Sequence, residues 1–164
     1  MNRSAGLPLA PAGSLPPGLP EWESLMRGAC DARRRGQAAL AEAGCRQALT
    51  VAQGLLSHGE AACADDRVAA FVVTHLQLAD LQRDAERIHD AAAHLCAAHC
   101  TLMALLRSPA TEPLLQQAAF RHSRETHAAL LAHLAEHGSD PAIVAALRAG
   151  CMPFSHAAHG ATLH

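Results

Sequence analysis

The stretch from Glu21 to Gly150 is dominated by apolar residues at helical spacing, and a few glycine and proline residues divide it into segments. Apolar side chains recur three and four positions apart, which is the period of one face of an α-helix. No segment of useful length alternates with the period of two that a half-buried strand requires. We therefore predict an all-α fold, with helices at about 21–35, 37–57, 65–82, 86–107, 112–137 and 141–150.

Residues typical of helix ends mark several of these boundaries. Gly36 and Gly59 follow the first two segments, where glycine favours a helix C-terminus. Thr111 is expected to cap the fifth segment, and the Asp140-Pro141 pair gives a similar start signal before the last one. These signals support the division into six helices.

Proline and glycine concentrate in residues 1–20, which lack apolar periodicity. We expect a flexible leader at 1–20, a helical domain at 21–150 and a flexible, histidine-containing tail at 151–164. The length of 164 residues and the hydrophobic content of 50% suit one globular domain. Prolines interrupt the leader where a signal peptide needs an apolar core, and no window reaches the ~18 apolar residues of a membrane span. We therefore expect a cytoplasmic location.

The charge balance argues against a polyanionic partner. A net charge of -2 arises from 13 basic and 15 acidic residues that are spread through the chain, so neither nucleic acid nor a membrane surface is expected to bind. Every basic residue is arginine, which indicates a GC-rich and bacterial coding sequence. The six cysteines are expected to be reduced thiols.

An internal repeat emerges when the first two predicted helices are laid over the next two. The first copy has Leu25, Gly28, Ala29, Ala32, Gly36, Ala41, Cys45 and Ala48. The second copy has His75, Leu78, Ala79, Gln82, Ala91, Leu95 and Ala98 in the same places. This pattern resembles the tetratricopeptide (TPR) repeat family, in which small side chains let antiparallel helices approach closely. In this chain the expected small contacts are Gly28, Ala29, Ala41 and Ala48.

The chain also departs from the family pattern. The offset from Ala41 to Ala91 is 50 residues, against ~34 in the family. The family's closing proline is missing, and His75 replaces an aromatic residue. The resemblance implies stacked antiparallel hairpins in a short TPR-like array of about two and a half repeats, with an ordinary helical bundle as the alternative.

The resemblance further implies a groove that binds a peptide or helix of a partner protein. Carrying the family's groove positions over gives Glu23, Met26, Cys30, Arg33, Arg34, Val73, Leu76, Asp80, Arg83 and Asp84. Here Arg33, Arg34 and Arg83 would hold a carboxylate, because guanidinium forks match that geometry. The alternative is that the run "ARRRG" is a solvent-exposed helix C-terminus, where positive charges oppose the helix dipole. Self-association through an apolar end of the array is a further expectation.

The run "AHLCAAHC" at 93–100 raises a second hypothesis, that of a metal-binding protein. On a helical wheel His94 projects away from Cys96, whereas Cys96 and Cys100 share a face. Neighbouring helices would complete a cluster for zinc or Cu(I), made of His75, Cys96, His99, Cys100 and His122. The alternative is that these side chains pack in the core and that the chain binds no cofactor.

The sequence contains no nucleophile elbow, phosphate-binding glycine loop or zinc-protease motif. His133 and His137 have the four-residue spacing of a chelating pair but lack a clear third ligand. We therefore expect a protein without catalytic activity that acts as a scaffold or adaptor.

Overall fold

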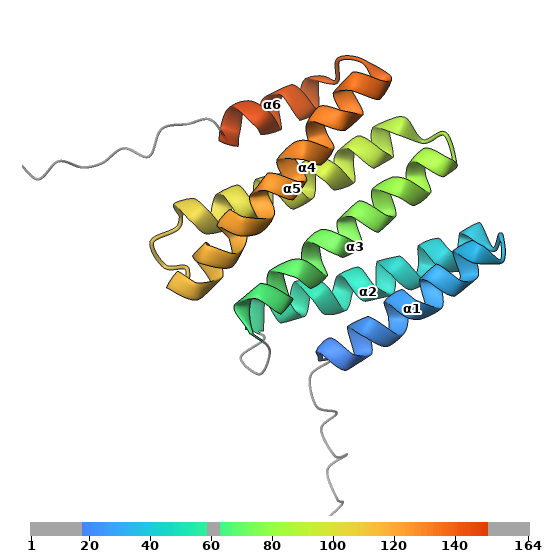
Figure 1. Ribbon diagram of the computed structural model, residues 1–164, viewed down its shortest axis with the longest axis horizontal. Helices are drawn as coiled ribbons and strands as arrows, with labels where there is room; N and C mark the ends of the chain where they lie inside the picture. The colour runs from blue at the N-terminus through green and yellow to red at the C-terminus, as the bar shows by residue number, and fades with distance from the viewer. Residues whose placement is uncertain (1–17, 59–62, 151–164) are drawn as a thin grey trace, which may run out of the picture.

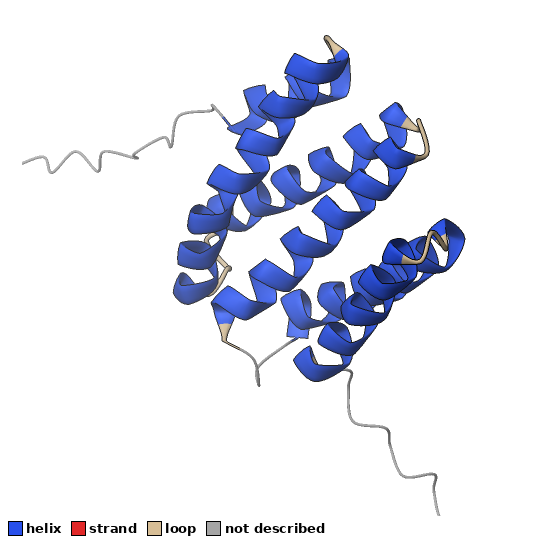
Figure 2. Cartoon of the chain, turned by 45° about the vertical axis from the view of Figure 1, so that its right-hand side comes forward, coloured by secondary structure: helices blue, strands red, loops and turns tan. Residues whose placement is uncertain are grey.

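The computed structural model describes residues 18–58 and 63–150, and within these ranges the chain forms six α-helices and no strand (Figures 1 and 2). The helices are α1 (Leu19–Arg34), α2 (Ala38–His58), α3 (Ala64–Asp84), α4 (Ile88–Arg107), α5 (Pro113–His137) and α6 (Pro141–Gly150). The all-α prediction is confirmed, and the predicted ranges differ from the observed ones by only a few residues.

The turns that close the first two hairpins have the same backbone hydrogen bonds, 50 residues apart. The N–H of Gly36 donates to the carbonyl of Arg33, and the N–H of Glu86 donates to that of Arg83, both at 2.9 Å. Gly36 and Glu86 also share positive φ angles, of 73° and 59°. The repeat that the sequence indicates is therefore present in the backbone, although its second copy uses a glutamate where the first uses glycine.

Consecutive helices pack as antiparallel hairpins, and the hairpins stack side by side (Figure 1). One layer contains α1, α3 and α5, and the other contains α2, α4 and α6. Each hairpin also packs against the first helix of the next, so that α2 contacts α3 and α4 contacts α5. The last hairpin differs, because α6 has 10 residues and packs more on α4 than on α5. The described chain is thus a helical array with a shortened end.

Small residues set the close approach of the first two helices, as expected, but one of them was wrongly chosen. Ala41 and Ala48 are fully buried between neighbouring helices. A Cβ placed on Gly44 would lie only 3.2 Å from the Cβ of Ala29, so alanine there would require Ala29 to shift by a few tenths of an ångström. Gly28, by contrast, has nothing within 4 Å of such a Cβ. The glycine that the packing requires is Gly44.

The expected helix caps agree with the structure in part. Asp140 caps α6, because its Oδ1 accepts a hydrogen bond from the N–H of Ala142 at 2.8 Å. The N-cap of α5 is Glu112 rather than Thr111, and its side chain makes no capping bond. The expected cap at Gly59, most of the predicted leader and the whole predicted tail lie outside the described residues. No helix within the described ranges is both long and apolar enough to span a membrane.

Candidate interaction surfaces

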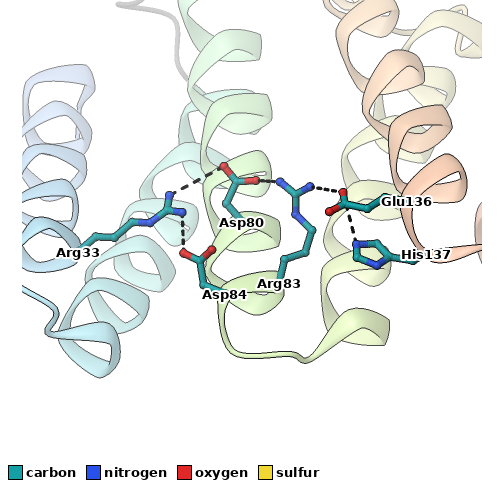
Figure 3. Close-up of polar contacts among 6 residues, drawn as sticks. All are labelled: Arg33, Asp80, Arg83, Asp84, Glu136 and His137. Carbon is teal, nitrogen blue, oxygen red and sulfur yellow. Dashed lines mark hydrogen bonds and ion pairs between the residues drawn. The ribbon is translucent and has the colours of Figure 1, made fainter.

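An ion-pair network joins the C-terminal ends of α1, α3 and α5 (Figure 3). Arg33 on α1 pairs with Asp84 on α3 at 2.6 Å and lies 3.9 Å from Asp80. Arg83 bonds to Asp80 on its own helix and reaches Glu136 on α5 at 3.4 Å. Glu136 in turn lies 3.6 Å from His137. The network therefore connects the three helices of one layer by side chains from each of them.

These pairs change the interpretation of the predicted arginine groove. Arg33 and Arg83 are neutralised by carboxylates of this chain, and Arg34 is paired with Asp31. A partner's carboxylate would have to displace them. This differs from both interpretations, because Arg33 and Arg83 form ion pairs with carboxylates of their own layer instead of ending in solvent or presenting unpaired guanidinium groups.

The apolar residues of the predicted groove also lie inside the molecule. Met26 is only 7% exposed, and its Sδ lies 3.8 Å from the Thr74 hydroxyl, so it was wrongly assigned to a partner contact. Leu76 and Val73 pack against the core from its edge. The indole N–H of Trp22 donates to Thr74 Oγ1 at 2.8 Å, which closes α1 onto α3. Of the predicted set, Glu23, Cys30, Arg34 and Asp84 are exposed.

A cavity of about 390 Å³ lies between the tips of the first two hairpins. Its charged lining residues are Arg33, Glu42, Asp84 and Arg87. Among them, Glu42 accepts hydrogen bonds from Arg46 at 2.5 Å, Arg87 at 2.7 Å and Gln82 at 3.1 Å. The bond from Arg46 does most to hold the pKa of Glu42 below its usual value, against the effect of burial. The arginines at this cavity are thus paired with acidic side chains, and it presents no excess of one charge.

The predicted metal cluster does not form. His75 Nδ1 faces His94 Nδ1 at 3.3 Å, whereas His99 Nδ1 bonds with Thr126 Oγ1 at 2.9 Å. The other three members also diverge: His122 lies 3.4 Å from Asp65, Cys100 is exposed, and Cys96 on α4 packs against a core cluster that α3, α4, α5 and α6 share. No group of three or more potential ligands is close enough to hold a metal ion in the part of the chain that the structure describes. The cluster hypothesis was wrong for these residues.

The buried histidines instead form three ring pairs within α3, α4 and α5. Their ring centroids lie 5.4 Å apart for His75 and His94, 5.8 Å for His99 and His127, and 4.7 Å for His133 and His137. Burial, with a smaller contribution from His94, lowers the pKa of His75 to about 4. Burial also lowers the pKa of His99 and of His133. The rings of His75, His99 and His133 are therefore neutral at pH 7 and pack in the core.

A different surface stands out on α5. Six exposed residues follow one another at intervals of three and four and so share one helix face. We call this the α5 stripe; it consists of Gln117, Phe120, Arg124, Ala128, Leu131 and Ala135. Phe120 is 54% exposed and Leu131 is 48% exposed, and the Arg124 guanidinium lies 5.6 Å from the centre of the Phe120 ring.

The position of α5 in the array explains why this stripe is uncovered. Thr126 and Leu130 on α5 are buried like Thr74 and Leu78 on α3, 52 residues earlier in each case (126 minus 74, 130 minus 78). By the same offset Phe120, Arg124 and Leu131 correspond to Val68, Val72 and Ala79, which are essentially fully buried. Within the described residues, a face that is buried in α3 is therefore exposed in α5.

Sequence reasoning missed this surface, although a signal was present. Phe120 is one of only three phenylalanines in a chain with 2% aromatic residues, and the spacing to Leu131 is three helical turns. That spacing alone predicts a shared face, but not whether the face is covered. Exposure depends on how the short α6 packs, and the sequence predicted the length of this helix but not its packing against α4.

Together, the six helices and their matched turns define the described part of the chain as an array of helical hairpins with an exposed stripe on α5. The chain belongs to a family described as a protein of unknown function, DUF2753, whose model matches residues 20–163 and so includes all six helices. No curated protein and no solved structure matches the chain.

Proposed function

We propose that this protein is a cytoplasmic, bacterial, non-catalytic protein-interaction module of TPR-like build, and that the α5 stripe binds an amphipathic helix of a partner protein. The observation that carries the proposal is the exposure of Phe120 and Leu131 at positions whose counterparts in α3 are buried. Large apolar side chains that share an exposed face are typical of an interaction site.

The packing inside the array indicates what kind of element fits there. The corresponding face of α3 belongs to a helix that packs against α4 and α5, which are themselves helices. Arrays of this kind need a terminal element that covers the last apolar face. An amphipathic helix supplies apolar residues at the same intervals of three and four, so its side chains can interdigitate with those of the stripe.

The ion-pair network supports this role indirectly. It connects α5 to α3 through Arg83 and Glu136, and α3 to α1 through Asp84 and Arg33. Arg121 adds a second connection between α5 and α3, since it pairs with Asp65 at 2.6 Å. A helix held at both ends presents a preorganised face, which lowers the entropy lost on binding.

The test compares proteins captured from the native host by wild type and by the variant Phe120→Asp/Leu131→Asp. The matched control is Leu40→Asp, because Leu40 is 59% exposed but lies on α2. We expect the stripe variant to lose the partner and the control to keep it. Hydrogen exchange should then show protection of residues 117–135 by the purified partner. Equal capture by the stripe variant and wild type would reject the proposal.

A further inference from the structure

We infer that the helix bound by the α5 stripe is α5 of a second copy of this chain, in an antiparallel pair whose twofold axis crosses the exposed side of α5 at the level of residues 125 and 126. The inference rests on the proposed function, because it names the partner for the same surface. It follows from the order of residues along the stripe.

Reversing the helix about this level brings the stripe onto itself to within half a residue, because the pairs Gln117–Ala135 and Arg124–Ala128 are centred at position 126 and the pair Phe120–Leu131 midway between 125 and 126. Phe120 then faces Leu131 of the second copy, so the two largest apolar residues pack together twice. Arg124 faces Ala128 and Gln117 faces Ala135, so each long side chain meets a small one. An isologous interface requires this kind of self-complementarity, because the same patch must serve both subunits.

The charges near the axis are also complementary. Arg124 and Glu125 are adjacent, exposed and opposite in sign. In the antiparallel pair, Ala128 of the second copy lies opposite Arg124. Glu125 of the second copy precedes that alanine by three residues, so the two are neighbours on the helix surface. Each Arg124 therefore reaches a Glu125 across the axis, and the arrangement contains two such pairs. The neighbour of Glu125 within its own chain is His122, at 3.7 Å.

The proposed pair has a defined extent. The α5 helix has 25 residues and is therefore about 37 Å long. A contact made by one helix from each subunit belongs to the small and weak class of interfaces. We therefore expect a dimer that dissociates on dilution, with a dissociation constant in the micromolar range.

Analytical ultracentrifugation of the full chain from micromolar to millimolar concentration tests this pairing. Wild type and the control Leu40→Asp should shift from monomer to dimer, whereas Phe120→Asp/Leu131→Asp should stay monomeric while keeping its helical circular dichroism. A wild type that is monomeric throughout this range would overturn the inference. The inference would also be overturned if the stripe of a monomer were protected from hydrogen exchange, because another segment of the same chain would then cover it.

Charge reversal tests the antiparallel geometry. Arg124→Glu and Glu125→Arg should each weaken dimerisation about tenfold, because like charges then meet across the axis. The double variant Arg124→Glu/Glu125→Arg exchanges the two charges, and it should recover the wild-type affinity. A double variant as weak as the single ones would overturn the proposed pairing.

The two proposals can fail separately. If wild type is monomeric but the stripe variant loses a captured partner, the proposal of a second copy is wrong, and the proposal that the stripe binds a partner helix stands. If wild type is monomeric and the stripe variant captures the same proteins as wild type, both proposals are wrong.

Discussion

At the scale of single residues, His75 is a histidine that packs in the core instead of binding a metal ion. Its ring packs edge-on against Phe71, with centroids 4.6 Å apart, and faces His94. Burial first, and His94 second, lower its pKa from 6.5 to about 4. A histidine whose pKa is lower in the folded state stabilises the fold above pH 6.5, and this stabilisation is lost as the pH falls toward 4.

We therefore predict that replacing His75 by Phe flattens the pH dependence of stability. At pH 7 both forms should have a similar free energy of unfolding, because the ring is neutral and phenylalanine fits an aromatic-sized position. Near pH 4 wild type should have lost roughly 3 kcal/mol that the variant keeps, as the pKa difference of about 2.5 units implies. Urea unfolding at the two pH values measures this. An unchanged pH dependence in His75→Phe would show that His75 is not the titrating group.

The same residues show why the metal site could not be predicted. The helical wheel correctly indicated that His94 projects away from Cys96. It could not fix how neighbouring helices slide past each other. The sequence placed His75 level with Cys96, but the structure pairs it with His94, two residues away. Likewise His99 meets Thr126 rather than His122, a shift of one helical turn. Such shifts are small along a helix axis and decisive for a ligand cluster.

At the scale of whole elements, the six helices were predictable because the helical spacing of apolar residues stops where glycine or proline residues occur. The turn at Glu86 is the exception, since no glycine marks it. Its φ of 59° is left-handed, a conformation that costs a residue with a Cβ about 1–2 kcal/mol. The equivalent turn at Gly36 avoids this cost.

We predict opposite effects of substitution at these two equivalent turns. Glu86→Gly should raise the free energy of unfolding by about 0.5–1 kcal/mol, because the strain removed exceeds the added chain entropy of glycine. Gly36→Ala should lower it by about 1 kcal/mol, although its Cβ would meet nothing within 4 Å. Chemical denaturation at pH 7 compares both variants with wild type. Destabilisation by Glu86→Gly would mean that the glutamate side chain contributes more than its backbone costs.

At the scale of the whole array of described helices, the exposure of the α5 stripe depends on the length and packing of α6. The second helices of the first two hairpins have 21 and 20 residues, whereas α6 has 10. Because α6 also packs mainly against α4, it leaves Phe120 and Leu131 on α5 exposed. The sequence predicted a shortened array, but only the packing of α6 identifies which face remains open.

The ion-pair network gives the last prediction, which separates its structural role from the binding role that the sequence suggested. The side chains of Arg33 and Arg83 are 38% and 36% exposed, so solvent screens their pairs. Replacing both by alanine should lower the free energy of unfolding by less than about 1 kcal/mol at low salt. The loss should shrink in high salt, because the Debye length falls to about 3 Å at 1 M.

The same double variant should keep dimerisation and partner capture, because neither arginine belongs to the α5 stripe. Unfolding at two salt concentrations, combined with sedimentation, tests both statements on one protein. If capture is lost while folding and dimerisation persist, the arginines contact the partner and the groove between α1 and α3 regains its predicted role. If dimerisation is lost as well, the network is required to hold α5 in place for pairing.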